Sequence, residues 1–346
     1  MTDELSTRFT AELQRSWEAA STGTEVFDRA VSIAGLTFCA TAAGDYLLDR
    51  IWPALGHHER STNTANLTLR MWELRSSNAP RPSLPTALFT DDGRLKHHGD
   101  LGEVRVHFDP DSQMLVAFDR RAGLAWCCVE DMAQITWWER AAPLRRLFAW
   151  WLELHGRPMI HAAAVGSPDG AVLLAGPSGS GKSTTALTAA RAGLGYLDDD
   201  HTVVSCHPSP RVHSLFSTAK LHLDSLDGDR SFASYLLDPV GEGAKAVVRM
   251  DRVPWVNLVT SAPVAAVAAI TVSPTGTTEL RPASPGQVLG ALAPSTILQL
   301  HGTGAATLSA LSRLVRQVPT ATLEVGSNPD EVVAAVSRLT RGSVEW

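Results

Sequence analysis

A glycine-rich run in the middle of the chain has the residue types that bind phosphate. The run Gly176-Pro-Ser-Gly-Ser-Gly-Lys182-Ser183 fits the pattern G-x-x-x-x-G-K-[ST]. The apolar stretch AVLLA before it predicts a strand, and TTALTAARA after it predicts a helix, which is the context that this motif requires. Glycines let the backbone turn so that successive N–H groups point at an anion, and the helix N-terminus adds its positive dipole end. We therefore expect a phosphate-binding loop.

The side chains of this loop have separate expected roles. Lys182 would neutralise charge on the β- and γ-phosphates, and the Ser183 hydroxyl would ligate Mg²⁺. The residues expected to hold the nucleotide are Gly176, Ser178, Gly179, Ser180, Gly181, Lys182, Ser183 and Thr184. The implied cofactors are Mg²⁺ and ATP or GTP, and the alternative is a glycine-rich turn with an unrelated lysine.

Three consecutive aspartates follow the next predicted strand. The strand GYL ends in Asp198, Asp199 and Asp200, and in a parallel α/β sheet that strand end lies at the same edge as the phosphate loop. One carboxylate there can hold Mg²⁺, and a second can accept the proton of an attacking hydroxyl. We assign Asp199 to the metal and Asp200 to the base, although the spacing also permits the reverse. The alternative is a solvated acidic turn, which we favour for Asp198.

A histidine lies on the strand before the loop. MIHAAAV and AVLLAG predict two strands joined by a tight turn between Ser167 and Gly170. That pairing places His161 opposite Gly176, at the mouth of the phosphate loop. We expect His161 to contact a phosphate or to relay a proton with the carboxylates. The alternative is a half-buried strand histidine.

The elements around these motifs indicate two domains. A chain of 346 residues exceeds the size at which one hydrophobic core usually stops growing. Residues 1–150 mix amphipathic helix and alternating strand patterns, whereas residues 151–346 alternate short apolar strands with Ala-rich helices. An apolar helix over residues 144–155 (LRRLFAWWLELH) lies near the boundary. We predict an N-terminal α+β domain over 1–150 and an α/β domain with the phosphate loop over 151–346.

Several elements are predicted within residues 1–150. Apolar residues at helical spacing predict a helix over residues 4–20. Strand-like alternation follows in VSIAGLTFCA and LTLRMWEL, and EVRVHF with QMLVAFD predicts a hairpin. The Ser- and Pro-rich residues 76–86 predict a loop. The apolar positions of the predicted helix are Leu5, Phe9, Leu13 and Trp17.

Composition narrows the class of protein. The formal net charge is −6, which excludes a generally basic protein that coats nucleic acid. Four cysteines in a chain of this length do not form a disulfide framework, and they lack the spaced pairs of a zinc site. The N-terminus MTDELSTRFTAELQRSWEAA has no apolar core of a signal peptide, and no apolar run is long enough to cross a bilayer. We expect a cytoplasmic protein without nucleic-acid or membrane partners.

The order of these motifs resembles the HPr kinase/phosphorylase superfamily, whose members are serine kinases acting on a protein or peptide. The shared features are a strand with His, a Gly turn, a strand, GPSGSGKST, a helix and an Asp-Asp pair. The resemblance covers about residues 155–345 and implies an HPr-kinase/PEP-carboxykinase-like fold with a mixed sheet, in which a hairpin leads into the phosphate loop. It also implies an active site of His161, Lys182 with its loop, Asp199 and Asp200.

One departure from the superfamily concerns the substrate. The segment E-[IH]-R-G-L-G that follows the acidic pair in the HPr-modifying enzymes is absent, and the chain reads SLFSTAKLHLDSL there. This puts HPr and the phosphorolysis activity in doubt. The chain looks more similar to the divergent kinases of lasso-peptide-type biosynthetic clusters, on the features IHAAAV, LAPSTILQL, VPTATLEVG and the N-terminal domain. The cations that such kinases use to steady a moving phosphoryl group would be Lys220, Lys245 and Arg249, with ordinary solvated charges as the alternative.

These motifs predict a kinase that transfers the γ-phosphoryl group of a nucleoside triphosphate to a hydroxyl. The resemblance implies that this hydroxyl belongs to a Ser of a peptide or protein, such as a natural-product precursor. Two alternatives remain open: a nucleotide-gated peptide-binding NTPase module, and a small-molecule kinase. The N-terminal domain would bind the acceptor peptide, with its aromatic residues forming a core as the alternative. The sequence is compatible with a homo-oligomer and does not set the oligomeric state.

Overall fold

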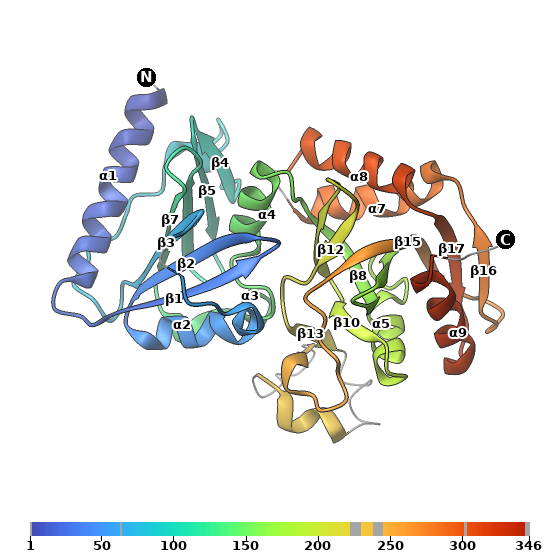
Figure 1. Ribbon diagram of the computed structural model, residues 1–346. Coiled ribbons are helices and arrows are strands. Elements are labelled where there is room, and N and C mark those ends of the chain that lie inside the picture. The colour runs from blue at the N-terminus through green and yellow to red at the C-terminus, as the bar shows by residue number, and fades with distance from the viewer. Residues whose placement is uncertain (1, 63, 222–229, 238–244, 301–302, 343–346) are drawn as a thin grey trace. The chain divides into compact units, whose positions relative to one another are not determined.

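The computed structural model describes the chain except for residues 1, 63, 222–229, 238–244, 301–302 and 343–346 (Figure 1). The contacts within the chain form two compact units, Met1–Trp151 and Leu152–Trp346. Each unit is a mixed α/β structure with a sheet that contains both parallel and antiparallel pairs. Among the described residues, no helix is both long enough and apolar enough to cross a membrane.

The first unit is built on a seven-stranded sheet of order β1-β2-β3-β7-β6-β5-β4. Its strands are β1 (Val26–Ile33), β2 (Leu36–Ala43), β3 (Leu67–Glu73), β4 (His98–Leu101), β5 (Val104–Asp109), β6 (Met114–Asp119) and β7 (Leu124–Val129). Its helices are α1 (Thr2–Ser21), α2 (Asp45–Ile51), α3 (Trp137–Ala141) and α4 (Arg145–Leu154), of which α4 runs past the boundary.

The helix predicted at the N-terminus is confirmed as α1. Phe9, Leu13 and Trp17 are buried on one face of it, whereas Leu5 is 46% exposed. The predicted hairpin over β5 and β6 is also confirmed. The stretch VSIAGLTFCA contains a turn and belongs to two antiparallel strands, β1 and β2. Ala34 and Gly35 form that turn with φ of 49° and 76°. The turn was not predicted because alanine seldom adopts this left-handed conformation.

The second unit contains an eight-stranded mixed sheet of order β10-β8-β11-β12-β15-β17-β16, with β9 paired to β8 and β15. Its strands are β8 (Met159–Ser167), β9 (Gly170–Ala175), β10 (Gly195–Asp198), β11 (His201–Ser205), β12 (Arg211–His213), β15 (Ser261–Val272), β16 (Glu279–Pro282) and β17 (Thr320–Val325). A separate two-stranded sheet consists of β13 (Thr218–Leu221) and β14 (Ala246–Arg249). The helices are α5 (Lys182–Arg191), α7 (Pro285–Gln299), α8 (Ala305–Gln317) and α9 (Pro329–Thr340).

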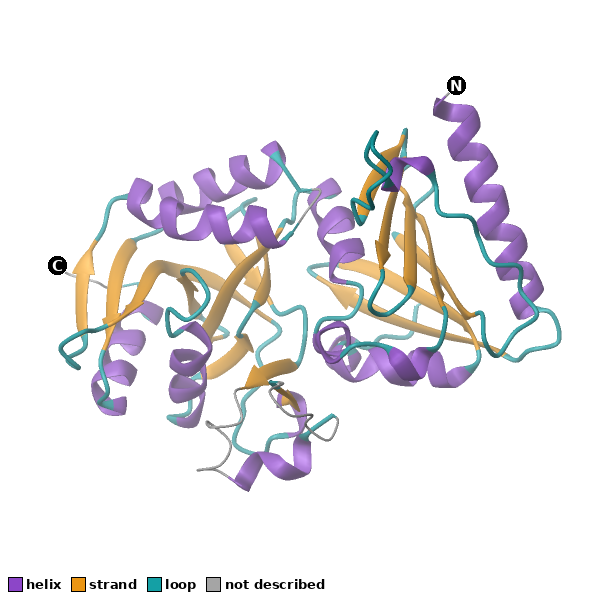
Figure 2. Ribbon diagram, turned by 180° about the vertical axis from the view of Figure 1, so that it is seen from behind, coloured by secondary structure: helices purple, strands orange, loops and turns teal. Residues whose placement is uncertain are grey.

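Two pairs of helices cover the two faces of this sheet (Figure 2). Successive strand residues point to opposite faces, so Ala163 and Val165 of β8 pack with α5 and α9. Ala162 and Ala164 pack with α7 and α8 on the other face. Small side chains on β8 and β9 let the helices approach closely, and this fixes α5 and α7 on either side of the hairpin that leads to the candidate site.

Candidate functional site

The glycine-rich loop connects the end of β9 at Ala175 to the start of α5 at Lys182. Gly179 and Gly181 have φ of +81° and +96°, which side chains with a Cβ rarely adopt. Gly181 caps the N-terminus of α5 without a side-chain hydrogen bond, so the first amides of the helix remain available to an anion. The strand–loop–helix arrangement is the one that the sequence predicts.

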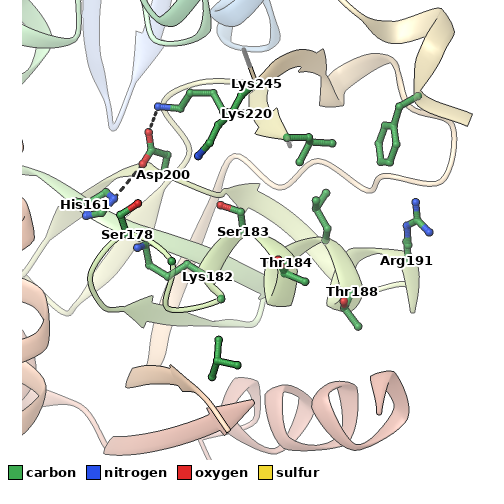
Figure 3. A pocket seen from close by; sticks show the side chains of 16 residues that line it. His161, Ser178, Lys182, Ser183, Thr184, Thr188, Arg191, Asp200, Lys220 and Lys245 are labelled. Carbon is green, nitrogen blue, oxygen red and sulfur yellow. Dashed lines mark hydrogen bonds and ion pairs between the residues drawn. The ribbon is translucent and has the colours of Figure 1, made fainter. Parts of the chain in front are cut away.

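A cavity of about 540 Å³ adjoins this loop (Figure 3). Six of the eight predicted loop residues line it: Ser178, Gly179, Gly181, Lys182, Ser183 and Thr184. Gly176 and Ser180 are buried and do not belong to the described lining residues. The Ser180 hydroxyl has no hydrogen-bond partner among the described residues.

The amino group of Lys182 is bonded to the loop that carries it. Nζ donates hydrogen bonds to the carbonyl oxygens of Gly176, at 2.8 Å, and Pro177, at 3.0 Å. Lys182 is only 6% exposed. Burial lowers the pKa of the amino group, and the nearby carboxylates of Asp200 and Asp199 oppose that effect. Within the described part of the chain, the hydrogen bonds of this buried ammonium go to neutral carbonyls, so it is well suited to take up phosphate oxygens, which carry charge.

The acidic residues lie at the end of β10, which is separated from β9 by the antiparallel strand β8. β10 and β11 both pair antiparallel with β8, with Asp198 opposite Ala164 and His201 opposite His161. Asp199 and Asp200 form the break between β10 and β11. Because β9 and β10 are each antiparallel to β8, they run in the same direction, and the aspartates follow a strand end at the same edge as the loop, as we expected. β8 lies between β9 and β10. His161 of β8 therefore lies beside the glycine-rich loop on one side and beside the aspartates on the other.

Asp200 is the centre of a charged cluster (Figure 3). Its Oδ1 lies 3.1 Å from His161 Nε2, its Oδ2 lies 2.9 Å from His201 Nδ1, and Oδ2 also pairs with Lys220 Nζ. Burial alone would raise the pKa of Asp200, but His201 and Lys220 together with the hydrogen bond from His161 hold that pKa well below its usual range. Asp200 is thus an ionised carboxylate that faces the cavity.

Asp199 has a different environment. It is 2% exposed and does not belong to the described residues that line the cavity. Its Oδ1 accepts a hydrogen bond from the Tyr196 hydroxyl at 3.1 Å, and its carboxylate also bonds to the Ser183 side chain. Burial and the charge of Asp200 raise the pKa of Asp199 to about 6. The predicted metal residues Ser183 and Asp199 are therefore brought together.

Asp198 stabilises the turn that presents the other two aspartates. Its Oδ1 accepts hydrogen bonds from the backbone N–H groups of Asp200, at 2.9 Å, and His201, at 3.1 Å. Its Oδ2 accepts one from Phe216 N–H at 3.2 Å. It is 1% exposed, so it is not the solvated acidic residue that we expected. Its carboxylate is fully used in bonding the backbone.

His161 is contacted by residues of α7, which the sequence did not predict. The pairing of Ala162 with Ala175 places His161 beside Gly176, as predicted. The backbone N–H of His161 donates to Thr296 Oγ1 at 3.1 Å, and Gln299 Nε2 lies 3.4 Å from each ring nitrogen. Both residues belong to α7, within the LAPSTILQL segment. That segment was noted only through the family resemblance, because nothing local signals a contact this distant in the chain.

The three predicted cations divide into two groups. Lys220 and Lys245 line the cavity, and Lys220 is already paired with Asp200. Arg249 does not line it among the described residues. Its guanidinium donates to both carboxylate oxygens of Asp251, at 3.2 and 2.7 Å.

The remaining lining residues were not predicted from the sequence. They are Leu187, Thr188, Arg191, Leu221, Phe232 and Val272. His201 was also missed, although it is buried beside Asp200 and its Nε2 has no hydrogen-bond partner among the described residues. Burial lowers the pKa of His201 to about 4, against the raising effect of Asp200.

The donor set near Ser183 fits a magnesium ion. The described residues contain no group of three or more His, Cys, Asp or Glu side chains arranged as a metal site. Mg²⁺ in nucleotide sites is usually bound by one or two protein oxygens together with phosphate oxygens and water. The Ser183 hydroxyl and the buried carboxylate of Asp199 are oxygen ligands of that kind.

The comparisons with known proteins find one weakly similar solved structure and no matching family. A structure of the Hpr(Ser) kinase/phosphatase from Coxiella burnetii is similar at 11% sequence identity and a TM-score of 0.29, covering 51% of this chain and 93% of that one. No protein-family profile matches the chain, and no curated protein matches it. What the site can do chemically therefore follows from its own side chains.

Proposed function

We propose that the protein is a Mg²⁺- and nucleoside-triphosphate-dependent kinase that transfers the γ-phosphoryl group to a hydroxyl, namely a Ser of a peptide or protein. The observation that carries this proposal is the position of Asp200. An ionised carboxylate lines the same cavity as a glycine-rich loop and its lysine. Phosphoryl transfer needs those two features side by side. The loop and its lysine must hold the phosphates, and the carboxylate must orient the attacking oxygen.

The phosphate end of the cavity would act through charge and backbone amides. When a triphosphate enters, the amides between Gly179 and Thr184 bind its oxygens, and Lys182 exchanges its two carbonyl partners for phosphate. The exchange is favourable because a hydrogen bond between two charged groups is stronger than one to a neutral carbonyl. Lys182 then stabilises the charge that gathers on the transferred group.

Ser183 and Asp199 would hold the metal ion. Binding would replace the hydrogen bond between them with two oxygen–metal contacts, and it would relieve the unfavourable burial of the Asp199 charge. Magnesium bound there would neutralise charge on the β- and γ-phosphate oxygens. Tyr196 bonds Asp199 Oδ1 and so fixes the orientation of the carboxylate.

Asp200 would orient the acceptor hydroxyl and take its proton. Its low pKa keeps it ionised, so it can accept a hydrogen bond from the incoming O–H group. A loose transition state makes orientation more important than base strength, because the proton leaves late. His161 holds one oxygen of Asp200 and Lys220 holds the other, which limits the rotation of the carboxylate.

The experiment that tests the proposal follows a labelled γ-phosphate. The full chain is incubated with Mg²⁺, γ-labelled ATP or GTP, and a degenerate peptide library with one fixed Ser, and a library with Ala at that position is the control. Label on the Ser library alone supports the proposal. Label released only as free phosphate would indicate an NTPase module, and label on a metabolite in a small-molecule extract would indicate a small-molecule kinase. Absence of any nucleotide turnover would contradict the kinase assignment.

A further inference from the structure

A second histidine contacts Asp200 from inside the protein. His201 is the first residue of β11, and its Nδ1 lies 2.9 Å from Asp200 Oδ2. It is 1% exposed and does not belong to the described residues that line the cavity. His161 and Lys220, the other described residues whose side chains pair with the carboxylate, do line it. Along the described lining, a ligand can therefore reach His161 and Lys220 but not His201.

The backbone fixes the place of His201 beside Asp200. His201 pairs directly with His161 across β11 and β8, and the two ring centroids lie 5.9 Å apart. Its backbone N–H donates to Asp198 Oδ1 at 3.1 Å, within the turn that presents Asp200. Among the described residues neither ring nitrogen makes an aligned hydrogen bond, so the short contact with Oδ2 is the polar contact of this buried ring. Separating the ring from the carboxylate would leave both groups worse satisfied.

We propose that His201 is a positioning residue, which holds the carboxylate of Asp200 in the direction in which it meets the acceptor hydroxyl. The inference rests on the proposed function, because that function gives Asp200 the task of orienting the hydroxyl. Once nucleotide fills the cavity, its phosphate oxygens compete with Asp200 for the ammonium of Lys220. The contact with His201 lies outside the described lining and remains. Asp200 therefore keeps its orientation during transfer, when a small misplacement of a reacting group is costly.

A purely structural role of His201 has to be separated from this one. A large buried side chain on a strand also packs, and its loss destabilises the fold whatever it does for Asp200. His201→Asn places an amide N–H near the position of Nδ1, whereas His201→Leu replaces the ring with an apolar side chain. Thr202→Val is the matched control. Thr202 is the next residue of β11, it is fully buried, and its hydroxyl has no hydrogen-bond partner among the described residues.

The experiment is a double-mutant cycle between His201 and Asp200. Transfer of labelled γ-phosphate to the Ser library gives kcat and KM, and calorimetry gives the binding of Mg²⁺–nucleotide. We expect His201→Leu to lower kcat by about 10- to 100-fold, with nucleotide binding changed less than about twofold. His201→Asn should recover most of this loss, and Thr202→Val should turn over as the wild type does. In the Asp200→Asn background, His201→Leu should cost less than about twofold more, because the carboxylate that it orients is gone.

The other outcomes overturn the inference. Equal losses with and without the Asp200 carboxylate would show that His201 acts on another group, and wild-type kcat in His201→Leu would show that the contact has no effect. Equal losses in His201→Asn and His201→Leu would indicate packing alone. Thermal unfolding gives the folded fraction of each variant. If His201→Leu does not fold, His201→Gln replaces it in the cycle, since its longer side chain moves the N–H away from the Nδ1 position. Absence of turnover in the wild type would instead contradict the proposed function itself.

Discussion

His161 Nε2 and Asp200 Oδ1 lie 3.1 Å apart, although one comes from β8 and the other from the break between β10 and β11. His201 of β11 pairs directly with His161 of β8, and this pairing brings the neighbouring Asp200 to the His161 ring. Two histidines and a lysine thus contact the carboxylate of Asp200 and restrict its rotation. The same carboxylate lines the cavity.

Lys182→Ala should reduce phosphoryl transfer by about 10²–10³ or more, the scale for losing one preorganised donor to a charged transition state. The fold should remain, because the hydrogen bonds that the lysine makes to the described residues go to two carbonyls of its own loop. Transfer is measured with labelled nucleotide, and folding by thermal unfolding. Lys96→Ala, at an exposed lysine of the first unit, is the control. Turnover near the wild-type rate in Lys182→Ala would remove the phosphate-loop assignment.

Asp200→Asn should reduce transfer by about 10² or more, with binding of the Mg²⁺–nucleotide complex changed only a few-fold. Asparagine keeps the shape but cannot accept a proton or neutralise Lys220. Asp199→Asn should instead weaken the dependence of binding on Mg²⁺, because it removes a buried oxygen ligand next to Ser183. Rates and Mg²⁺ titrations are compared for both variants. The reverse pattern would exchange the two roles, and no effect in either would exclude both.

Thr296→Val should lower the free energy of unfolding by about 1–3 kcal/mol, because it leaves the buried N–H group of His161 without an acceptor. Valine has nearly the shape of threonine, so a cavity does not contribute. Ser295→Ala is the matched neighbour. Among the described residues, its hydroxyl bonds a carbonyl of its own helix, and its loss should cost much less. Denaturant titrations followed by circular dichroism measure both variants, and equal losses would contradict the prediction.

The pH dependence of stability should include a contribution from His107 in the first unit. Burial, with a smaller effect from Arg146, lowers the pKa of His107 from 6.5 to about 3, and its Nδ1 donates to the His97 carbonyl at 2.6 Å. Between these values the unfolded state binds a proton that the folded state does not. The free energy of unfolding should therefore fall as the pH is lowered from about 6.5 toward 3, by up to about 1.4 kcal/mol per pH unit.

Tryptophan fluorescence can follow this unfolding, because most of the tryptophans lie in residues 1–151. Denaturant titrations at pH 7, 6 and 5 give the slope of stability against pH for the wild type and for His107→Gln, which does not titrate. The variant should have a shallower slope, whatever its absolute stability. Parallel slopes in the two proteins would show that His107 does not contribute.

The sequence predicted the parts of the site that are set by local patterns. The loop between β9 and α5 follows from an apolar strand, three glycines and a helix, and the hairpin turn places His161 beside Gly176. The antiparallel course of β10 and β11 along β8 was not predictable, because strand direction depends on how distant segments pair. The contacts of Thr296 and Gln299 with His161 were not predictable either, because packing between distant segments leaves no periodic pattern in the sequence.

Residue type alone did not distinguish structural from chemical roles. Asp198 and Asp200 are neighbours of one type, yet one bonds three backbone amides and the other lines the cavity. Arg249 was grouped with Lys220 as a cation for phosphate, but Asp251 two residues away pairs with it. Such outcomes depend on the direction of each side chain at a turn or strand end, which spacing does not give.

The two hydrogen bonds from Lys182 to Gly176 and Pro177 make the empty loop a competitor of its own ligand. An incoming anion has to replace both carbonyls before it gains the lysine. A singly charged ion such as chloride offers little more than it displaces, whereas a polyphosphate offers several charged oxygens at once. If the loop binds nucleotide as proposed, this exchange would select polyphosphates over the small, singly charged anions in solution, before any base, metal ion or acceptor is recognised.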